Sequence, residues 1–276
     1  MKKLLLVLVG TFAIVASALA QDVKREIVQV SGDVYRFQNN FHFSLVVATS
    51  EGTVVVDPIN NEASSWLKEN LSTVTDKPVT HLIYSHSHGD HASGGATFAD
   101  DAEVIAHANA PDSIDGVAPE VRFEDTHTLS LGGKTIELTY LGPGHGQDMI
   151  AVVVRPENVA FIVDVAAPKR LPYRDFGGAN IDGFIAQVKK AETLEFEIFA
   201  PGHGRIGTPE ELTEARIYVE DLRAGVLAAL KAGKTVEQIT EELSLEAYSD
   251  WQQYKDWRPL NIQGMVKYLT EAGLVE

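Results

Sequence analysis

Short apolar runs separated by turn residues dominate the chain from residue 26 to residue 57. They predict strands over 26–30, 33–38, 43–49 and 53–57, with Gly32 and Gly52 in hairpin turns. Residues 62–72 have helical spacing, with Trp66 and Leu71 on one face. A strand is then predicted over 80–84, and a helix is expected to begin near Ala92.

A second set of strands follows and leads into helices. The pattern predicts strands over 103–106, 127–131, 134–141, 149–155, 159–164 and 197–200, and helices over 181–193 and 209–231, with a mainly helical tail over 235–275. Two sheet-forming halves with helices outside them indicate an α/β (α+β) fold. We expect a four-layer αββα sandwich with extra C-terminal helices, and a site at the loop edge between the sheets.

The first twenty residues have the pattern of a secretory signal peptide. Lys2 and Lys3 precede an apolar run over 4–15, and Ala18-Leu19-Ala20 forms a small-residue cleavage site. The alternative is an uncleaved membrane anchor, for which the run is short. We therefore expect residues 1–20 to be removed, residues 21–276 to form a single domain in the periplasm or outside the cell, and no membrane attachment after cleavage.

Charge and composition limit the classes of binding partner and the types of atom that can bind a metal. The formal net charge of −16 argues against charge-driven binding to nucleic acid or to anionic membranes, so a small-molecule substrate is expected. The chain contains no cysteine, which excludes disulfides and a lipid-modified cysteine anchor. Every metal ligand must therefore offer nitrogen or oxygen. Nothing in the sequence indicates the oligomeric state.

The most specific local motif is Ser-His-Ser-His-Gly-Asp-His over residues 85–91. It places His86, His88, Asp90 and His91 directly after the apolar run that is predicted as the strand over 80–84. Imidazole nitrogens and a carboxylate at the mouth of a strand suit a divalent metal of intermediate softness, above all zinc.

Three more candidate ligands follow predicted strands. His145 and His203 each stand between glycines, and Asp164 ends an apolar strand. Glycines beside a ligand permit tight turns that direct several side chains to one point. Either histidine alone could be a turn or core residue without a function. Together with residues 85–91, the two histidines indicate a metal site. The remaining histidines, His42, His81, His107 and His127, are interpreted as structural.

With these residues in place, the chain resembles the metallo-β-lactamase fold superfamily, whose signature is H-x-H-x-D-H followed by a later His, Asp and His. The resemblance covers nearly all of the chain after the signal segment. It implies that His86, His88 and His145 hold a first metal, that Asp90, His91 and His203 hold a second, and that Asp164 bridges the two. Asp57 matches a buried aspartate of the family, which either orients a ligand histidine or simply occupies a turn at the end of a strand.

The resemblance implies hydrolysis with two Zn²⁺ ions, with Fe or Mn as alternatives. Two metals about 3.5–4 Å apart can lower the pKa of a shared water, which then attacks an amide or ester carbonyl. Asp90 is the expected catalytic residue, because it can orient the attacking water and pass a proton to the leaving group.

The substrate stays open. The stretches 142–148 and 175–180 resemble those of the cysteine-bearing β-lactamases, but Asp164 stands where those enzymes have cysteine, and His91 where they have no ligand. Both departures resemble glyoxalase II-like hydrolases and lactonases, so a lactonase or thioesterase is the alternative to β-lactamase activity. Ala167 occupies the position of the lysine that binds a substrate carboxylate in those hydrolases. Lys169 or Arg170 either replaces that lysine or, as we favour, belongs to a solvated surface pair.

Two other classes of function are weaker hypotheses. A mononuclear iron oxidoreductase would resemble the persulfide dioxygenases, but it would not need His91 and His203. A binding or metal-scavenging protein would have no need of a bridging Asp164. In the segment 37–43, Phe41 either packs on the sheet, which strand propensity favours, or forms an apolar lid over the site.

Overall fold

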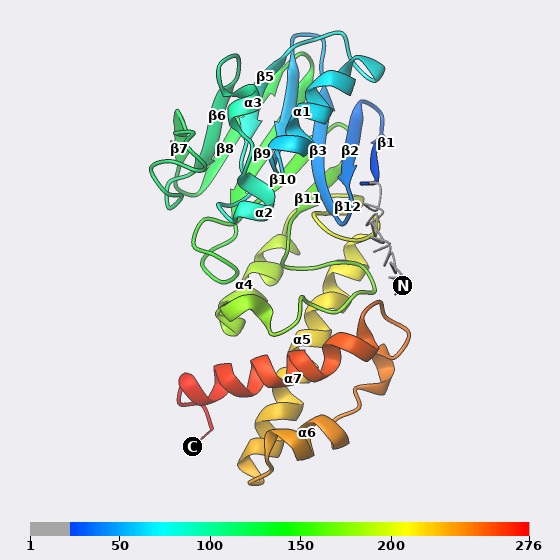
Figure 1. Cartoon of the computed structure of the whole chain (residues 1–276), viewed down its shortest axis with the longest axis vertical. Coiled ribbons are helices and arrows are strands. Elements are labelled where there is room, and N and C mark those ends of the chain that lie inside the picture. The colour runs from blue at the N-terminus through cyan, green and yellow to red at the C-terminus, as the bar shows by residue number, and fades with distance from the viewer. Residues whose placement is uncertain (1–22, 276) are drawn as a thin grey trace, which may run out of the picture.

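The computed structural model describes residues 23–275. Two β-sheets pack face to face between layers of helix, and the C-terminal helices extend away from one end of the sandwich (Figure 1). The predicted signal segment, residues 1–20, lies outside the described residues. None of the helices in the described part of the chain is both long and apolar enough to cross a bilayer.

The first sheet has seven strands in the order of the sequence. A meander of antiparallel strands runs from β1 to β4, and β4 to β7 are parallel to one another. The strands are β1 (Arg25–Ser31), β2 (Val34–Asn39), β3 (His42–Ala48), β4 (Thr53–Val56), β5 (Val79–Ile83), β6 (Glu103–His107) and β7 (Val121–Phe123).

The second sheet has five strands in the order β12-β11-β10-β9-β8, antiparallel except for the pair β11 and β12. The strands are β8 (Thr126–Leu131), β9 (Lys134–Tyr140), β10 (Ile150–Arg155), β11 (Val159–Ile162) and β12 (Ile198–Pro201).

The helices start where capping side chains satisfy free backbone N–H groups. Asn60 caps α1 and Asn180 caps α4, while Thr208 and Glu211 form a capping box ahead of the long α5. The α-helices are α1 (Asn61–Asn70), α2 (Gly89–Ala92), α3 (Ala96–Ala99), α4 (Ile181–Ala191), α5 (Pro209–Lys231), α6 (Val236–Glu242) and α7 (Tyr254–Glu271). The 3₁₀ turns are η1 (Leu71–Thr73), η2 (Phe176–Gly178) and η3 (Glu246–Tyr248).

Three apolar clusters define the layers. One packs α1 onto the outer face of the first sheet, with Leu67 and Leu82 among its members. A second lies between the sheets and is filled mainly by valine, leucine and isoleucine. The third packs α4, α5 and α7 against the second sheet, around Phe199 and Tyr218. This arrangement confirms the predicted αββα sandwich with additional C-terminal helices.

Several predicted boundaries were wrong. The helix expected to begin near Ala92 in fact ends there, so Asp90 and His91 lie inside the four-residue α2. Strand β11 ends at Ile162, and Asp164 lies two residues beyond it with a φ of 59°. Strand β7 was not predicted, because three residues are too few to show a periodic pattern.

Candidate metal centre

All seven predicted ligands lie at one edge of the sandwich. In the first sheet, β5 ends just before His86 and His88, and α2 follows at the same edge. In the second sheet, His145 lies in the loop between β9 and β10, while Asp164 and His203 follow β11 and β12. The pairing directions put the ends of β5, β9, β11 and β12 at this edge. The fold therefore brings together residues from both sheets.

The side chains form two clusters of potential ligands. In each cluster, one nitrogen or oxygen atom per residue lies within 4.8 Å of the corresponding atoms of the others. The first group consists of His86, His88, His145 and Asp164, and the second group consists of His42, Asp90, His91 and His203. Two such clusters fit a dinuclear metal site.

Asp164 lies between the two groups and faces both. Its Oδ2 is 3.1 Å from Nε2 of His145 and 3.4 Å from Nε2 of His86. Its Oδ1 is 3.0 Å from Nε2 of His203 and 3.2 Å from Nε2 of His91. Each carboxylate oxygen therefore serves a different group, which is the arrangement that a bridging carboxylate requires.

The nitrogen and oxygen atoms of the two groups are arranged for binding metal ions and not for hydrogen bonds with one another. Nε2 of His86 and Oδ1 of Asp164 are buried and have no well-directed hydrogen bond among the described residues. Nε2 of His91 lies 3.1 Å from Nε2 of His203. Nδ1 of His203 donates to the carbonyl oxygen of Phe41 at 2.7 Å, so the Nε2 of His203 presents a lone pair. A cation shared by these atoms satisfies lone pairs that would otherwise face each other.

The charges within the cluster are strongly coupled. Burial raises the pKa of Asp164, but the surrounding imidazoles, His91 foremost, hold it well below its ordinary value. Burial lowers the pKa of His91, yet the carboxylates of Asp164 and Asp57 raise it well above the ordinary value. The centre therefore keeps an ionised carboxylate whose side chain is only 9% exposed, where a charge needs compensation.

Asp57 supports ligands of both groups. It is fully buried, and its Oδ2 is 3.6 Å from Nδ1 of His91. It also accepts hydrogen bonds from the backbone N–H of Ser85 at 2.8 Å and from the Ser85 hydroxyl at 2.6 Å. The oxygen of that hydroxyl lies 3.0 Å from Nδ1 of His86. Because the hydroxyl hydrogen goes to Asp57, Nδ1 of His86 is the donor, which leaves Nε2 free to bind a metal. The φ of 61° places Asp57 in the left-handed region, directly after strand β4.

Gln187, which was not among the predicted site residues, holds the backbone of the loop that carries His145. It is fully buried on α4, where its Oε1 accepts the backbone N–H of His145 at 2.8 Å and its Nε2 donates to the carbonyl of Gly142 at 2.7 Å. A Cβ atom on Gly144 would lie 2.5 Å from Oε1 of Gln187, so only glycine fits there. In the sequence, the role of Gln187 is indicated only by the presence of a glutamine on the apolar face of the helix predicted over 181–193.

His42 was predicted to be structural, but its imidazole lies among the potential ligands. It is the first residue of β3 and belongs to the second group. The other three histidines lie outside the two groups. His107 stacks on Tyr140 with ring centroids 3.7 Å apart, His127 stacks on Phe123, and His81 contacts Thr80 and Glu103.

Three side chains that were considered as substrate contacts have defined surroundings in the structure. The side chain of Phe41 does not pack on the sheet, since the residue is 75% exposed beside the second group. Lys169 pairs with Glu214 at 2.7 Å. Arg170 lies over the ring of Trp257, 5.0 Å from its centroid, and burial lowers its pKa although Asp164 opposes this.

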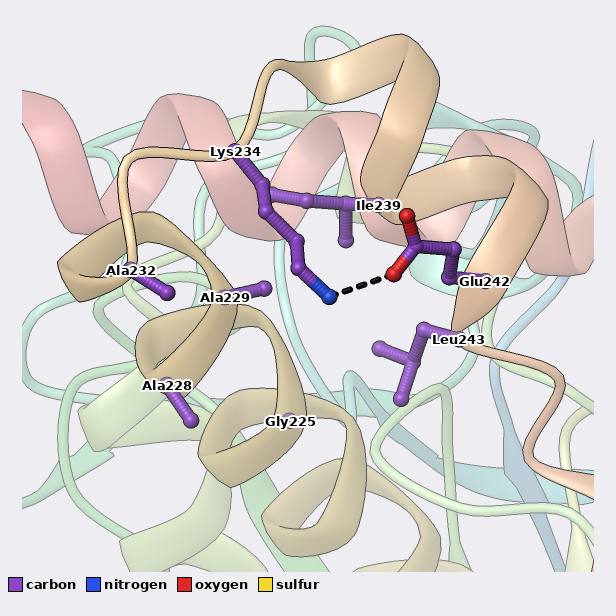
Figure 2. Close-up of a pocket in the computed structure, with 8 residues that line it drawn as sticks. All are labelled: Gly225, Ala228, Ala229, Ala232, Lys234, Ile239, Glu242 and Leu243. Carbon is purple, nitrogen blue, oxygen red and sulfur yellow. Dashed lines mark hydrogen bonds and ion pairs between the residues drawn. The ribbon is translucent and has the colours of Figure 1, made fainter.

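A pocket of about 300 Å³ lies elsewhere, between the end of α5 and α6 (Figure 2). Small and apolar side chains line most of it, and an ion pair between Lys234 and Glu242 spans it. Its lining contains no histidine, serine, threonine or cysteine, and its lysine is paired with Glu242. The histidine cluster at the sheet edge is therefore the chemically equipped site.

Comparison with known proteins agrees with this site. Residues 39–203, more than half of the chain, match the metallo-beta-lactamase superfamily. The chain is 32% identical over 193 residues to hydroxyacylglutathione hydrolase of Polaromonas sp., which covers 67% of this chain and 69% of the relative. It is 27% identical to the 2,4-dinitroanisole O-demethylase subunit alpha of Nocardioides sp., over 77% of this chain and 67% of the relative.

A solved structure supports the fold independently of close sequence similarity. The metallo-beta-lactamase from Pontibacter korlensis superposes with a TM-score of 0.62 at 20% identity, covering 71% of this chain and 99% of that protein. The matched range 39–203 runs from the end of β2 to the last predicted ligand, His203, and so includes all seven predicted ligands. The chain therefore belongs to the metallo-beta-lactamase superfamily.

Proposed function

We propose that this protein is an exported di-metal hydrolase that cleaves an amide or ester bond in a small molecule. The observation that carries the proposal is the position of Asp164, whose two carboxylate oxygens face two separate histidine groups. A site for one metal would need only one of those groups. This argues against the mononuclear iron oxidoreductase.

In this proposal, His86, His88 and His145 hold the first metal, Asp90, His91 and His203 hold the second, and Asp164 is shared. Nitrogen-rich ligand sets suit zinc, with iron or manganese as alternatives. When bound, the metals would supply an activated water at neutral pH and polarise the carbonyl under attack.

Asp90 is the proposed catalytic residue. Its side chain is 54% exposed, whereas the side chains of His86 and His91 are fully buried, so Asp90 is open to substrate. In the metal-free chain, a hydrogen bond from His42 holds the pKa of Asp90 well below its usual value, so this carboxylate is already ionised before a metal binds. An ionised, exposed carboxylate can orient the attacking water and carry its proton to the leaving group.

The substrate class is proposed from the ligand set and from the relatives together. A β-lactam amide is the first candidate, and a lactone or thioester is the second. Hydroxyacylglutathione hydrolase supports the second, because its name describes a thioester-type substrate and it shares 32% identity with this chain. Alanine at position 167 removes one common anchor for a substrate carboxylate.

The test is a metal analysis combined with a hydrolysis panel. Purified protein from which residues 1–20 have been removed would be loaded with zinc and offered a penicillin, a cephalosporin, a carbapenem, an acyl lactone and a glutathione thioester. We expect two metal equivalents and hydrolysis of at least one substrate. Two bound metals with all five substrates intact would refute the proposal, and so would a single bound iron with oxidase activity.

Export rests on the sequence of residues 1–20 alone. We propose a periplasmic or secreted location, with cleavage after Ala20. N-terminal sequencing of protein recovered from the periplasm or medium would give Gln21 as the first residue, whereas an intact Met1 in a membrane fraction would contradict cleavage.

A further inference from the structure

His42 reaches the metal centre by a route that none of the seven predicted ligands uses. Strand β3 runs antiparallel to β4, so its first residue lies at the edge where β4 and β5 end. His42 is that first residue. The turn before it contains Asn40 with a φ of 55°, and the carbonyl of Phe41 accepts the hydrogen bond from His203. The hairpin is thus fixed directly against the second group.

The side chain of His42 lies within the ligand set and is not merely near it. Nε2 of His42 is 3.4 Å from Oδ2 of Asp90, and its ring centroid is 4.7 Å from that of His203 and 5.4 Å from that of His91. All four residues offer a donor atom within 4.8 Å of the others. Two nitrogens bound to one zinc ion lie at most roughly 4.2 Å apart, because each bond is about 2.1 Å long. Only a small side-chain movement separates the present arrangement from ligation.

We propose that His42 is an additional ligand of the second metal. This inference rests on the proposed two-metal function and deepens it. The second metal would then have five side-chain donors, His42, Asp90, His91, His203 and the shared Asp164, against four for the first metal.

The extra ligand makes the two metal positions chemically unequal. Zinc prefers four donors, so five side chains exceed its usual need. A mixed imidazole and carboxylate set with a higher coordination number suits Fe²⁺ or Mn²⁺. We therefore expect the second position to accept these ions more readily than the first, and the first position to retain the open coordination that a substrate requires.

The test compares metal binding by the wild-type chain with that of His42→Phe and His42→Ala. Phenylalanine preserves the ring contacts with His203 and His91 and removes only the nitrogens. His81→Phe is the matched control, because His81 is a part-buried histidine outside both groups. We expect His42→Phe to bind the first metal normally and the second at least about 100-fold more weakly, since loss of groups that merely orient a ligand already costs 10–100-fold.

A spectroscopic readout separates ligation from simple support of Asp90. In the protein loaded with Co²⁺, each ligand imidazole gives its own strongly shifted proton signals, and Co²⁺ with more than four donors absorbs visible light more weakly than four-coordinate Co²⁺. His42→Phe should lose the signals of one imidazole and absorb more strongly, and His81→Phe should do neither.

An unchanged set of shifted signals in His42→Phe would overturn the proposal, whatever the change in affinity, because a residue that only holds Asp90 contributes no such signal. Failure of the proposed function looks different. It would appear as wild-type protein that binds two metals and hydrolyses nothing, with the His42 results unaffected.

Discussion

The two groups of the metal centre are supported by different chemistry. Ligands of the first group are oriented by neutral partners, the Ser85 hydroxyl at His86 and the Gln187 amide at His145. In the second group, His91 lies directly against the buried carboxylate of Asp57, and His203 donates to a backbone carbonyl. Neutral partners fix the direction of a ligand, whereas a carboxylate also makes the imidazole more basic. The second group should therefore depend more on charge and the first more on geometry.

Removal of Asp164 should affect both groups equally, because both groups face this residue. We expect Asp164→Ala to lose both metals and to lower kcat/KM by at least about 10³-fold, the upper end of the cost of one lost electrostatic contact in an active site. Metal content by mass spectrometry and hydrolysis rates would measure this. Asp76→Ala is the control, since Asp76 is a highly exposed carboxylate with a lysine neighbour. Two metals retained in Asp164→Ala would contradict the bridging assignment.

His203→Ala and His145→Ala should each empty one group and leave the other filled. We expect each variant to retain one metal and the folded structure, and to lose at least about 10²-fold in kcat/KM. Metal stoichiometry together with circular dichroism would check both expectations. If His203→Ala still held two metals, the assignment of the second group would be wrong.

Asp57→Asn and Gln187→Ala test the charge difference itself. Asp57→Asn removes the charge beside His91, while its single amide oxygen keeps one of the two Ser85 hydrogen bonds. We therefore expect a loss of about 10–100-fold in affinity for the second metal and a smaller loss for the first. Gln187→Ala should weaken only the first metal, by about 10-fold at most. Competition with a chromophoric chelator would give both affinities. Equal effects on both metals in either variant would show that the two groups are not independently supported.

Phe41→Ala should have the smallest effect. The side chain is exposed, so the free energy of unfolding should change by no more than about 0.5 kcal/mol. If the ring covers a bound substrate, KM should rise a few-fold while kcat stays nearly constant, because the contact would be made equally in substrate and transition state. A change in kcat alone would argue against a lid. Tyr173→Ala, which removes another exposed aromatic ring, is the control.

Much of the fold and most of the centre were predictable from the sequence. His145 and His203 carry flanking glycines and follow apolar runs, so local patterns alone locate them at strand ends. His42 carries no such pattern. It begins a strand rather than ending one, and only the antiparallel pairing of β3 with β4 brings it to the same edge. Pairing direction is a property of the sheet, which a local pattern does not specify.

Short helices and contacts between buried polar side chains were also not predicted from the sequence. Helix α2 has four residues, less than two turns, so periodicity could not place Asp90 and His91 on it. Gln187 acts across 42 positions of sequence, from α4 to the loop that carries His145. Such a contact depends on how helix and sheet pack together, and nothing in either segment alone specifies the partner.

The ligands come from both sheets, so metal binding should affect the rate at which the protein unfolds. Residues 86–91 belong to the edge of the first sheet, and His145, Asp164 and His203 belong to the edge of the second. Metals held by both sides can bind fully only after the sheets have docked, late in folding. Interactions that form after the transition state slow unfolding without speeding folding. Metal binding should thus lower the unfolding rate of the native protein far more than it raises the folding rate.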